Sequence, residues 1–178
     1  TLYGSTKLSE MYLLQDRSSI IQGRMNDFMQ LLEKHFPKGA KIISTHNIHP
    51  LCYCFKWLSL LFSQEYHIPQ LVLIWDALFA HFDSLLEYAT YVAVAQVKML
   101  EKKLDIEDYI VTMNALAKEN VEEVGKLLQI ANNFWLEDHP SEKGQLLTKM
   151  SNFFKNIQLP HMNPIHLPTP SPKKPNHS

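Results

Sequence analysis

Residues 55–80 read FKWLSLLFSQEYHIPQLVLIWDALFA, and two strongly apolar helical patterns meet in this stretch across one short polar turn. The first pattern has large apolar side chains at helical spacing: Phe55, Leu58, Leu61 and Phe62. Trp57 and Leu60 make a second side of this helix apolar, so we expect the rest of the protein to enclose it. The other segments are therefore predicted to pack around residues 55–80.

The polar residues Gln64, Glu65 and His67 interrupt the apolar pattern, and Pro69 suits the first turn of a second helix. We interpret Gln64 and Glu65 as a solvated pair in this turn, although either could face a partner. The second helix has a stripe of apolar side chains: Leu71, Ile74, Trp75, Leu78 and Phe79. Asp76 is the only charge among these side chains, so we expect its carboxylate to have a polar partner.

The composition is typical of a globular protein made of helices. The chain has 178 residues, of which 46% are hydrophobic and 20% are charged, and no stretch alternates as a strand does. The longest uncharged run in a helical pattern, residues 88–97, falls short of the ~20 residues that span a bilayer, so we interpret it as a buried helix segment. The 17 basic and 18 acidic side chains leave no electrostatic footprint for nucleic acid. We therefore predict an all-α protein that binds no nucleic acid and has no transmembrane segment.

The spacing of F-K-W, Q-E-Y and W-D resembles the second half of a TBC domain, the domain that activates Rab GTPases. The residues of the matching motif are Phe55, Lys56, Trp57, Leu60, Gln64, Glu65, Pro69, Trp75 and Asp76. The resemblance extends over residues 20–135 and is greatest to the member 13 type of the family. The family usually has arginine where this chain has Lys56, and lysine cannot form a bidentate guanidinium contact. We therefore expect a weaker or different ion pair at Lys56.

The resemblance implies a multi-helix array like the C-terminal lobe of a TBC domain, with a GTP-bound Rab-type GTPase as partner. In that family an arginine stabilises charge on the transferred phosphate and a glutamine positions the attacking water. Both come from the N-terminal half of the domain, so the resemblance implies that this chain is inactive by itself. The alternative is a non-catalytic helical module that binds a GTPase or a scaffold. Either protein is expected in the cytoplasm, free or peripherally associated with membranes.

One segment superficially resembles the Q-G-M-N sequence that carries the glutamine finger of the family. It reads Gln22-Gly23-Arg24-Met25-Asn26, so an arginine interrupts the motif, and it lies much closer to Phe55 than the finger does in the family. We interpret it instead as part of an amphipathic helix with Gln22 and Arg24 solvated. The apolar face of this helix consists of Ile21, Met25, Phe28 and Leu32.

A second segment offers nitrogen and sulfur ligands that zinc accepts: His46, His49, Cys52 and Cys54. Zinc sites commonly use two separated ligand pairs, and two helical cysteines at this spacing would point about 200° apart. We therefore expect neither a metal nor a cofactor, and a metal-dependent enzyme is the least favoured function. The sequence has no phosphate-cradling loop and no nucleophile elbow, so any link to GTP requires a partner GTPase.

The patterns divide the chain into four parts. We predict the end of a preceding segment (1–19), the TBC-type helical part (20–137), an amphipathic C-terminal helix (141–157) and a disordered proline-rich tail (158–178). Within the second part we expect a connection over 36–47, one long helix over 82–104, and helix starts at Asp105 and Asn120. Thr169 and Ser171, each followed by proline, are candidate phosphorylation sites in the tail. The absence of an initiating methionine predicts a fragment or a processed chain.

Overall fold

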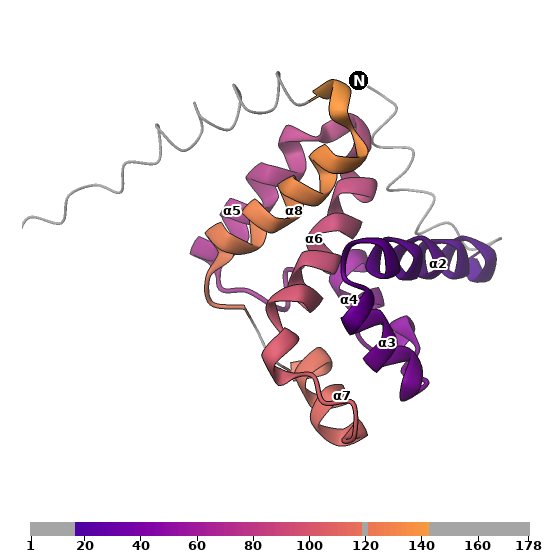
Figure 1. Ribbon diagram of the computed structural model, residues 1–178. Coiled ribbons are helices and arrows are strands. Elements are labelled where there is room, and N and C mark those ends of the chain that lie inside the picture. The colour runs from indigo at the N-terminus through magenta and orange to yellow at the C-terminus, as the bar shows by residue number, and fades with distance from the viewer. Residues whose placement is uncertain (1–16, 119–120, 143–178) are drawn as a thin grey trace, which may run out of the picture. The chain divides into compact units, whose positions relative to one another are not determined.

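The computed structural model describes residues 17–118 and 121–142. Within these ranges the chain forms α-helices and short 3₁₀ helices and no strand, which confirms the all-α prediction (Figure 1). The α-helices are α2 (Arg17–His35), α3 (Pro37–Thr45), α4 (Cys54–Ser59), α5 (Ile68–Ala80), α6 (Leu85–Met99), α7 (Tyr109–Lys118) and α8 (Val124–Asp138). The 3₁₀ helices are η1 (Pro50–Cys52), η2 (Phe82–Ser84), η3 (Glu101–Lys103) and η4 (Pro140–Glu142).

The chain divides into two units, Thr1–Pro140 and Ser141–Ser178, and helices α2 to α8 belong to the first. Several predictions fall outside the described residues: the segment before α2, the start at Asn120, the amphipathic helix, and the tail with Thr169 and Ser171. They stay predictions. No helix in the described part of the chain is long and apolar enough to cross a membrane.

Helix α6 forms the centre of the first unit, with α2 packed on one side and α8 on the other (Figure 1). All its residues from Leu85 to Val97 are buried except Glu87, as the uncharged pattern of this segment predicted. Small side chains at Ala89, Ala93 and Ala95 leave room for the neighbouring helices to approach closely. The predicted single helix over 82–104 is wrong at both ends, because α6 is flanked by the 3₁₀ helices η2 and η3.

Helices α5 and α8 run side by side in the same direction. At their beginnings the Gln70 side-chain amide donates to the Glu122 carbonyl (3.1 Å), and at their ends the rings of His81 and Trp135 meet edge to face. Helix α8 ends at Asp138, immediately before a His-Pro pair, and the residue before a proline disfavours helical backbone. The C-terminal ends of α5 and α8 therefore lie together.

Helix α2 buries Met25, Phe28 and Leu32 on one face, as their spacing predicted. The predicted connection over 36–47 is wrong, because α3 occupies most of it. The proline and glycine of this segment have roles other than breaking a helix. Pro37 lies in the first turn of α3, and a Cβ at position 39 would overlap the ring of Phe36, so glycine allows close packing there.

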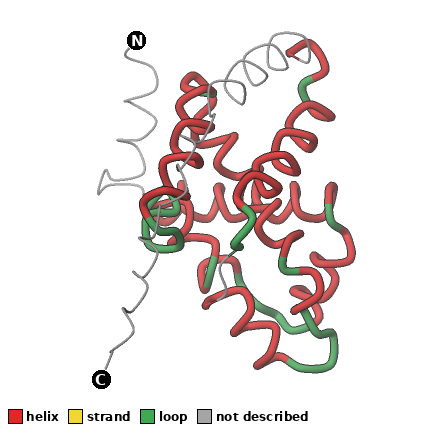
Figure 2. The backbone as a smooth tube through the Cα atoms, turned by 90° about the vertical axis from the view of Figure 1, so that its left-hand side faces the viewer, coloured by secondary structure: helices red, strands yellow, loops and turns green. Residues whose placement is uncertain are grey.

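Short loops connect the helices (Figure 2). The predicted helix start at Asp105 lies three residues too early. The Asp105 carboxylate accepts from the Glu107 amide (2.8 Å) in a turn, whereas the Asp108 carboxylate accepts from the Val111 amide (3.0 Å) and caps α7. Asp105 and Asp108 are equally suitable N-cap residues by type. Only the backbone conformation of the folded chain shows that Asp108 caps α7.

Candidate functional site

The turn between α4 and α5 contains an ion pair that joins two pieces of the sequence motif. The Lys56 ammonium lies 2.9 Å from a carboxylate oxygen of Glu65 and donates to the Ala117 carbonyl, also at 2.9 Å. The carboxylate of Glu65 is buried, so the interpretation of this residue as solvated is wrong, whereas Gln64 is exposed as expected. A buried carboxylate requires a counter-charge, and Lys56 provides it while tying α4 to α7.

Trp75 supports the same turn from α5. Helix α4 ends at Ser59, earlier than its apolar pattern predicted, and Leu61 and Phe62 have φ angles of 45° and 62°, in the left-handed region that non-glycine residues rarely adopt. The indole N–H of Trp75 donates to the Leu61 carbonyl at 2.9 Å. The apolar stripe of α5 indicated that Trp75 would be enclosed. In the structure Trp75 is only half-buried.

The next motif residue, Tyr66, attaches the turn to the central helix. Its hydroxyl donates to the side-chain carbonyl of Gln96 at 3.0 Å, in the buried interior. Burial raises the pKa of Tyr66 above its usual value, so the hydroxyl keeps its proton and remains a donor. The hydrogen bond satisfies a polar atom of Gln96 that lies among apolar side chains.

The structure brings Lys56, Glu65 and Trp75 together around the α4–α5 turn. Trp57 is buried and Phe55 is half-buried. The other motif residues do not join this group: Leu60, Gln64, Pro69 and Asp76 are exposed. The exposure of Leu60 contradicts the prediction of an enclosed first helix. The expected partner of Asp76 is absent too, because within the described residues its exposed carboxylate makes no hydrogen bond or ion pair.

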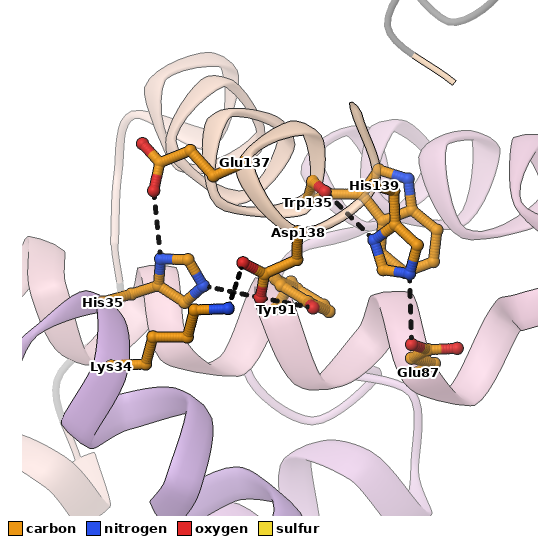
Figure 3. Close-up of polar contacts among 8 residues, drawn as sticks. All are labelled: Lys34, His35, Glu87, Tyr91, Trp135, Glu137, Asp138 and His139. Atoms are coloured by element: carbon orange, nitrogen blue, oxygen red, sulfur yellow. Dashed lines mark hydrogen bonds and ion pairs between the residues drawn. The ribbon is translucent and has the colours of Figure 1, made fainter. Parts of the chain in front are cut away.

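A polar cluster at the C-terminal ends of α2 and α8 was not predicted from the sequence (Figure 3). Asp138 accepts hydrogen bonds from the Lys34 ammonium, from the Tyr91 hydroxyl (2.9 Å) and from the Nε2 side of His35 (2.9 Å). The other ring nitrogen of His35 lies 3.4 Å from Glu137. Burial raises the pKa of Asp138, but these hydrogen bonds outweigh it and lower the pKa to about 2. The charged carboxylate therefore joins α2, α6 and α8.

Beside this cluster, α2 and α6 border a groove of about 450 Å³. Its lining mixes both charges, with Arg24, Asp27 and Lys34 from α2 and Glu87 from α6. Arg24 was expected to be solvated and is instead half-buried in this lining. Gln22 is exposed as expected, and its amide donates to Asn26 one turn along the helix (3.1 Å).

The residues considered as zinc ligands are held by separate interactions. His46 contacts the Asp105 carbonyl through Nε2 (2.8 Å), while His49 accepts the Leu51 amide through Nδ1 (3.2 Å). Cys52 is exposed, and burial raises the pKa of the Cys54 thiol well above its usual value, which disfavours the thiolate that binds zinc. In residues 17–118 and 121–142, no three histidine, cysteine or acidic side chains come together as a metal site would require.

Comparisons with known proteins find one family and several relatives. Residues 2–104 match the model of the Rab-GTPase-TBC domain. TBC1 domain family member 13 of Homo sapiens is 34% identical over 89 residues, which cover 50% of this chain and 22% of that protein. The member 13 protein of Mus musculus is 35% identical over 92 residues, again 50% and 22% of the two chains. TBC1 domain family member 5 homolog B of Dictyostelium discoideum is 31% identical over 86 residues, 48% of this chain and 8% of that protein.

The matched region therefore spans 22% of the length of the two member 13 relatives. No solved structure matches the chain significantly. The family model covers more than half of the chain, including the segment in which Lys56, Glu65 and Trp75 converge. This chain belongs to the Rab-GTPase-TBC domain family.

Proposed function

We propose that this chain is part of a Rab GTPase-activating protein and contributes to binding a Rab-type GTPase in its GTP-bound state. The observation that carries the proposal is the family match over residues 2–104. The proposed setting is the regulation of membrane traffic, in the cytoplasm or at the surface of a membrane. No cofactor enters the proposal, because the GTPase itself holds the nucleotide.

We further propose that this chain does not supply the catalytic arginine and glutamine of the family. Arginine occurs only at positions 17 and 24, and neither arginine follows the I-P-x-D-x-x sequence that precedes the catalytic arginine in the family. Arg24 belongs to the wall of the groove between α2 and α6, and Gln22 is bonded to its own helix. Without an arginine beside the phosphates, GTP hydrolysis is expected to be slower by a factor of ~10³–10⁵ than in a complete activator.

The proposed role of the motif residues is to shape the surface that a GTPase contacts. The Lys56–Glu65 ion pair and the bond from Trp75 to the Leu61 carbonyl support this role, because both hold the α4–α5 turn in one conformation. Gln64 and Asp76 are the exposed polar members of the motif, so they are the ones available to a partner. Trp57 is buried and Phe55 is half-buried, so the proposed role of these two motif residues is packing beneath that surface.

The test combines binding and single-turnover GTP hydrolysis on a panel of Rab GTPases. Immobilised chain should retain a subset of Rabs loaded with a non-hydrolysable GTP analogue, prefer them to the GDP forms, and leave hydrolysis at its intrinsic rate. Gln64→Ala with Asp76→Ala should weaken retention, whereas Asn114→Ala, an exposed change on α7, serves as the matched control. Acceleration that Arg24→Ala or Gln22→Ala abolishes would refute the proposal about catalysis. Failure to retain any Rab in either nucleotide state would refute the proposal about binding.

A further inference from the structure

Helix α5 has two apolar faces, and only one of them is covered. Leu71, Ile74 and Leu78 are buried on the side that meets α6 and α8. A second set of apolar side chains is exposed: Ile68 (77%), Val72 (46%), Phe79 (53%) and, in η2, Phe82 (41%). Isolated exposed apolar residues are common on protein surfaces, but a row of them on one helix is a feature of interaction sites.

The exposed side chains form one continuous ridge. Positions 68, 72, 75 and 79 are separated by four, three and four residues, which places their side chains above one another along a helix. Trp75 occupies the centre of this ridge, half-buried, with its indole N–H held by the Leu61 carbonyl. A ridge with this spacing has the shape that packs into the groove of another helix.

The border of the ridge is acidic. Asp76 in α5 and Asp83 in η2 are both exposed, and neither carboxylate makes a hydrogen bond or ion pair with another described residue. Neither α5 nor η2 contains a lysine or an arginine. A partner that covers the ridge would therefore gain from cationic side chains at the edge of its own apolar stripe.

We propose that the outer ridge of α5 (Ile68, Val72, Trp75 and Phe79) docks an amphipathic helix of a partner protein whose apolar stripe is bordered by lysine or arginine. The 13 residues of α5 extend over about 20 Å, so a helix of three to four turns covers the ridge. A second copy of this chain is a poorer occupant, because the same acidic border would face itself across a symmetric contact.

The test uses two fluorescein-labelled helical peptides of 13 residues, the length of α5. Both carry leucine and phenylalanine at i, i+4, i+7 and i+11, and they differ only in a border of lysine or of glutamate. Fluorescence anisotropy with the full chain should show saturable binding of the lysine peptide and at least about tenfold weaker binding of the glutamate peptide. Equal binding of both peptides, or binding of neither, would overturn the proposal.

Variants of the chain locate the site. Val72→Ala with Phe79→Ala should weaken binding of the lysine peptide by about tenfold or more, because both side chains lose apolar contact with it. Asp76→Asn with Asp83→Asn should reduce the preference for lysine over glutamate. Ile110→Ala on α7, at a residue that is 67% exposed, is the matched control and should change nothing. An equal loss with Ile110→Ala would overturn the assignment to α5.

Two further measurements keep the proposal testable whatever the variants do to folding. A lysine peptide with a photoreactive group should crosslink to residues 68–82 of the unmodified chain, and crosslinks confined to other segments would contradict the site. Light scattering should show that the chain remains a monomer as its concentration rises. A dimer that the Val72→Ala and Phe79→Ala variant dissociates would assign the ridge to a second copy and overturn the proposal.

Discussion

Replacing Asp138 by asparagine tests the charge that joins the ends of α2 and α8, because the side chain keeps its size and loses its carboxylate. In the folded protein this carboxylate accepts hydrogen bonds from Lys34, His35 and Tyr91 (Figure 3). Burial raises the pKa of Asp138, but the hydrogen bonds dominate and lower it from 3.8 to about 2. The ionised carboxylate therefore stabilises the folded state relative to the unfolded state.

The size of this contribution follows from the shift in pKa. One pKa unit corresponds to ~1.4 kcal/mol, so the shift sets an upper limit of ~2.5 kcal/mol. The Lys34 side chain is 59% exposed, so solvent screens part of the interaction, and we expect ~1–2 kcal/mol. Because the pKa of Asp138 is depressed in the folded state, the stabilisation is complete above about pH 5 and is lost as the pH falls towards 2. About half of it remains at pH 3.

Urea unfolding followed by circular dichroism at pH 6 and pH 3 measures this contribution. Asp138→Asn should lower the free energy of unfolding by ~1–2 kcal/mol at pH 6 and by about half as much at pH 3. Asp76→Asn is the control, because its carboxylate is exposed, and it should have little effect at either pH. A variant as stable as the wild type at pH 6, or a loss of the same size at both pH values, would refute the reasoning.

Three further predictions concern stability, each measured as the free energy of unfolding in urea. Lys56→Met leaves the buried Glu65 carboxylate without its cation and should cost ~1–3 kcal/mol, more than Lys56→Arg, which keeps the charge; equal losses would contradict the ion pair. Trp75→Phe should cost ~1 kcal/mol by freeing the Leu61 carbonyl, and Trp75→Ala less than the ~3–5 kcal/mol of an enclosed tryptophan. Gly39→Ala should destabilise the protein because its methyl group meets the Phe36 ring, whereas Gly23→Ala, in open space on a helix, should stabilise it by ~0.5–1 kcal/mol. The opposite order for the two glycines would contradict the close packing of α3.

The sequence predicts those features that depend on residues close together in the chain. Met25, Phe28 and Leu32 share a face because a helix repeats every 3.6 residues, and the structure buries all three. The uncharged run of residues 88–97 likewise predicts that this part of α6 is buried. The family motif is equally local, since its residues lie within 22 positions, from Phe55 to Asp76.

Local patterns were ambiguous where one residue type serves two purposes. Proline and glycine at positions 37 and 39 indicated a connection, yet the proline begins a helix and the glycine allows an aromatic ring to approach. Gln64 and Glu65 looked alike as polar residues of a turn. The structure exposes the first and buries the second, whose carboxylate pairs with Lys56.

The sequence by itself determined the all-α class, the buried face of α2 and, through its motif, membership of the Rab-GTPase-TBC domain family. The tertiary structure alone decided which apolar face of α5 is covered, because both faces have helical spacing and only contacts with α6 and α8 distinguish them. It also decided the pairing of His35 with Asp138, 103 positions apart, which no periodic pattern relates. Such contacts depend on how whole helices pack. The free energy of that packing comes from many side chains throughout the interior, and no short segment of the sequence specifies it.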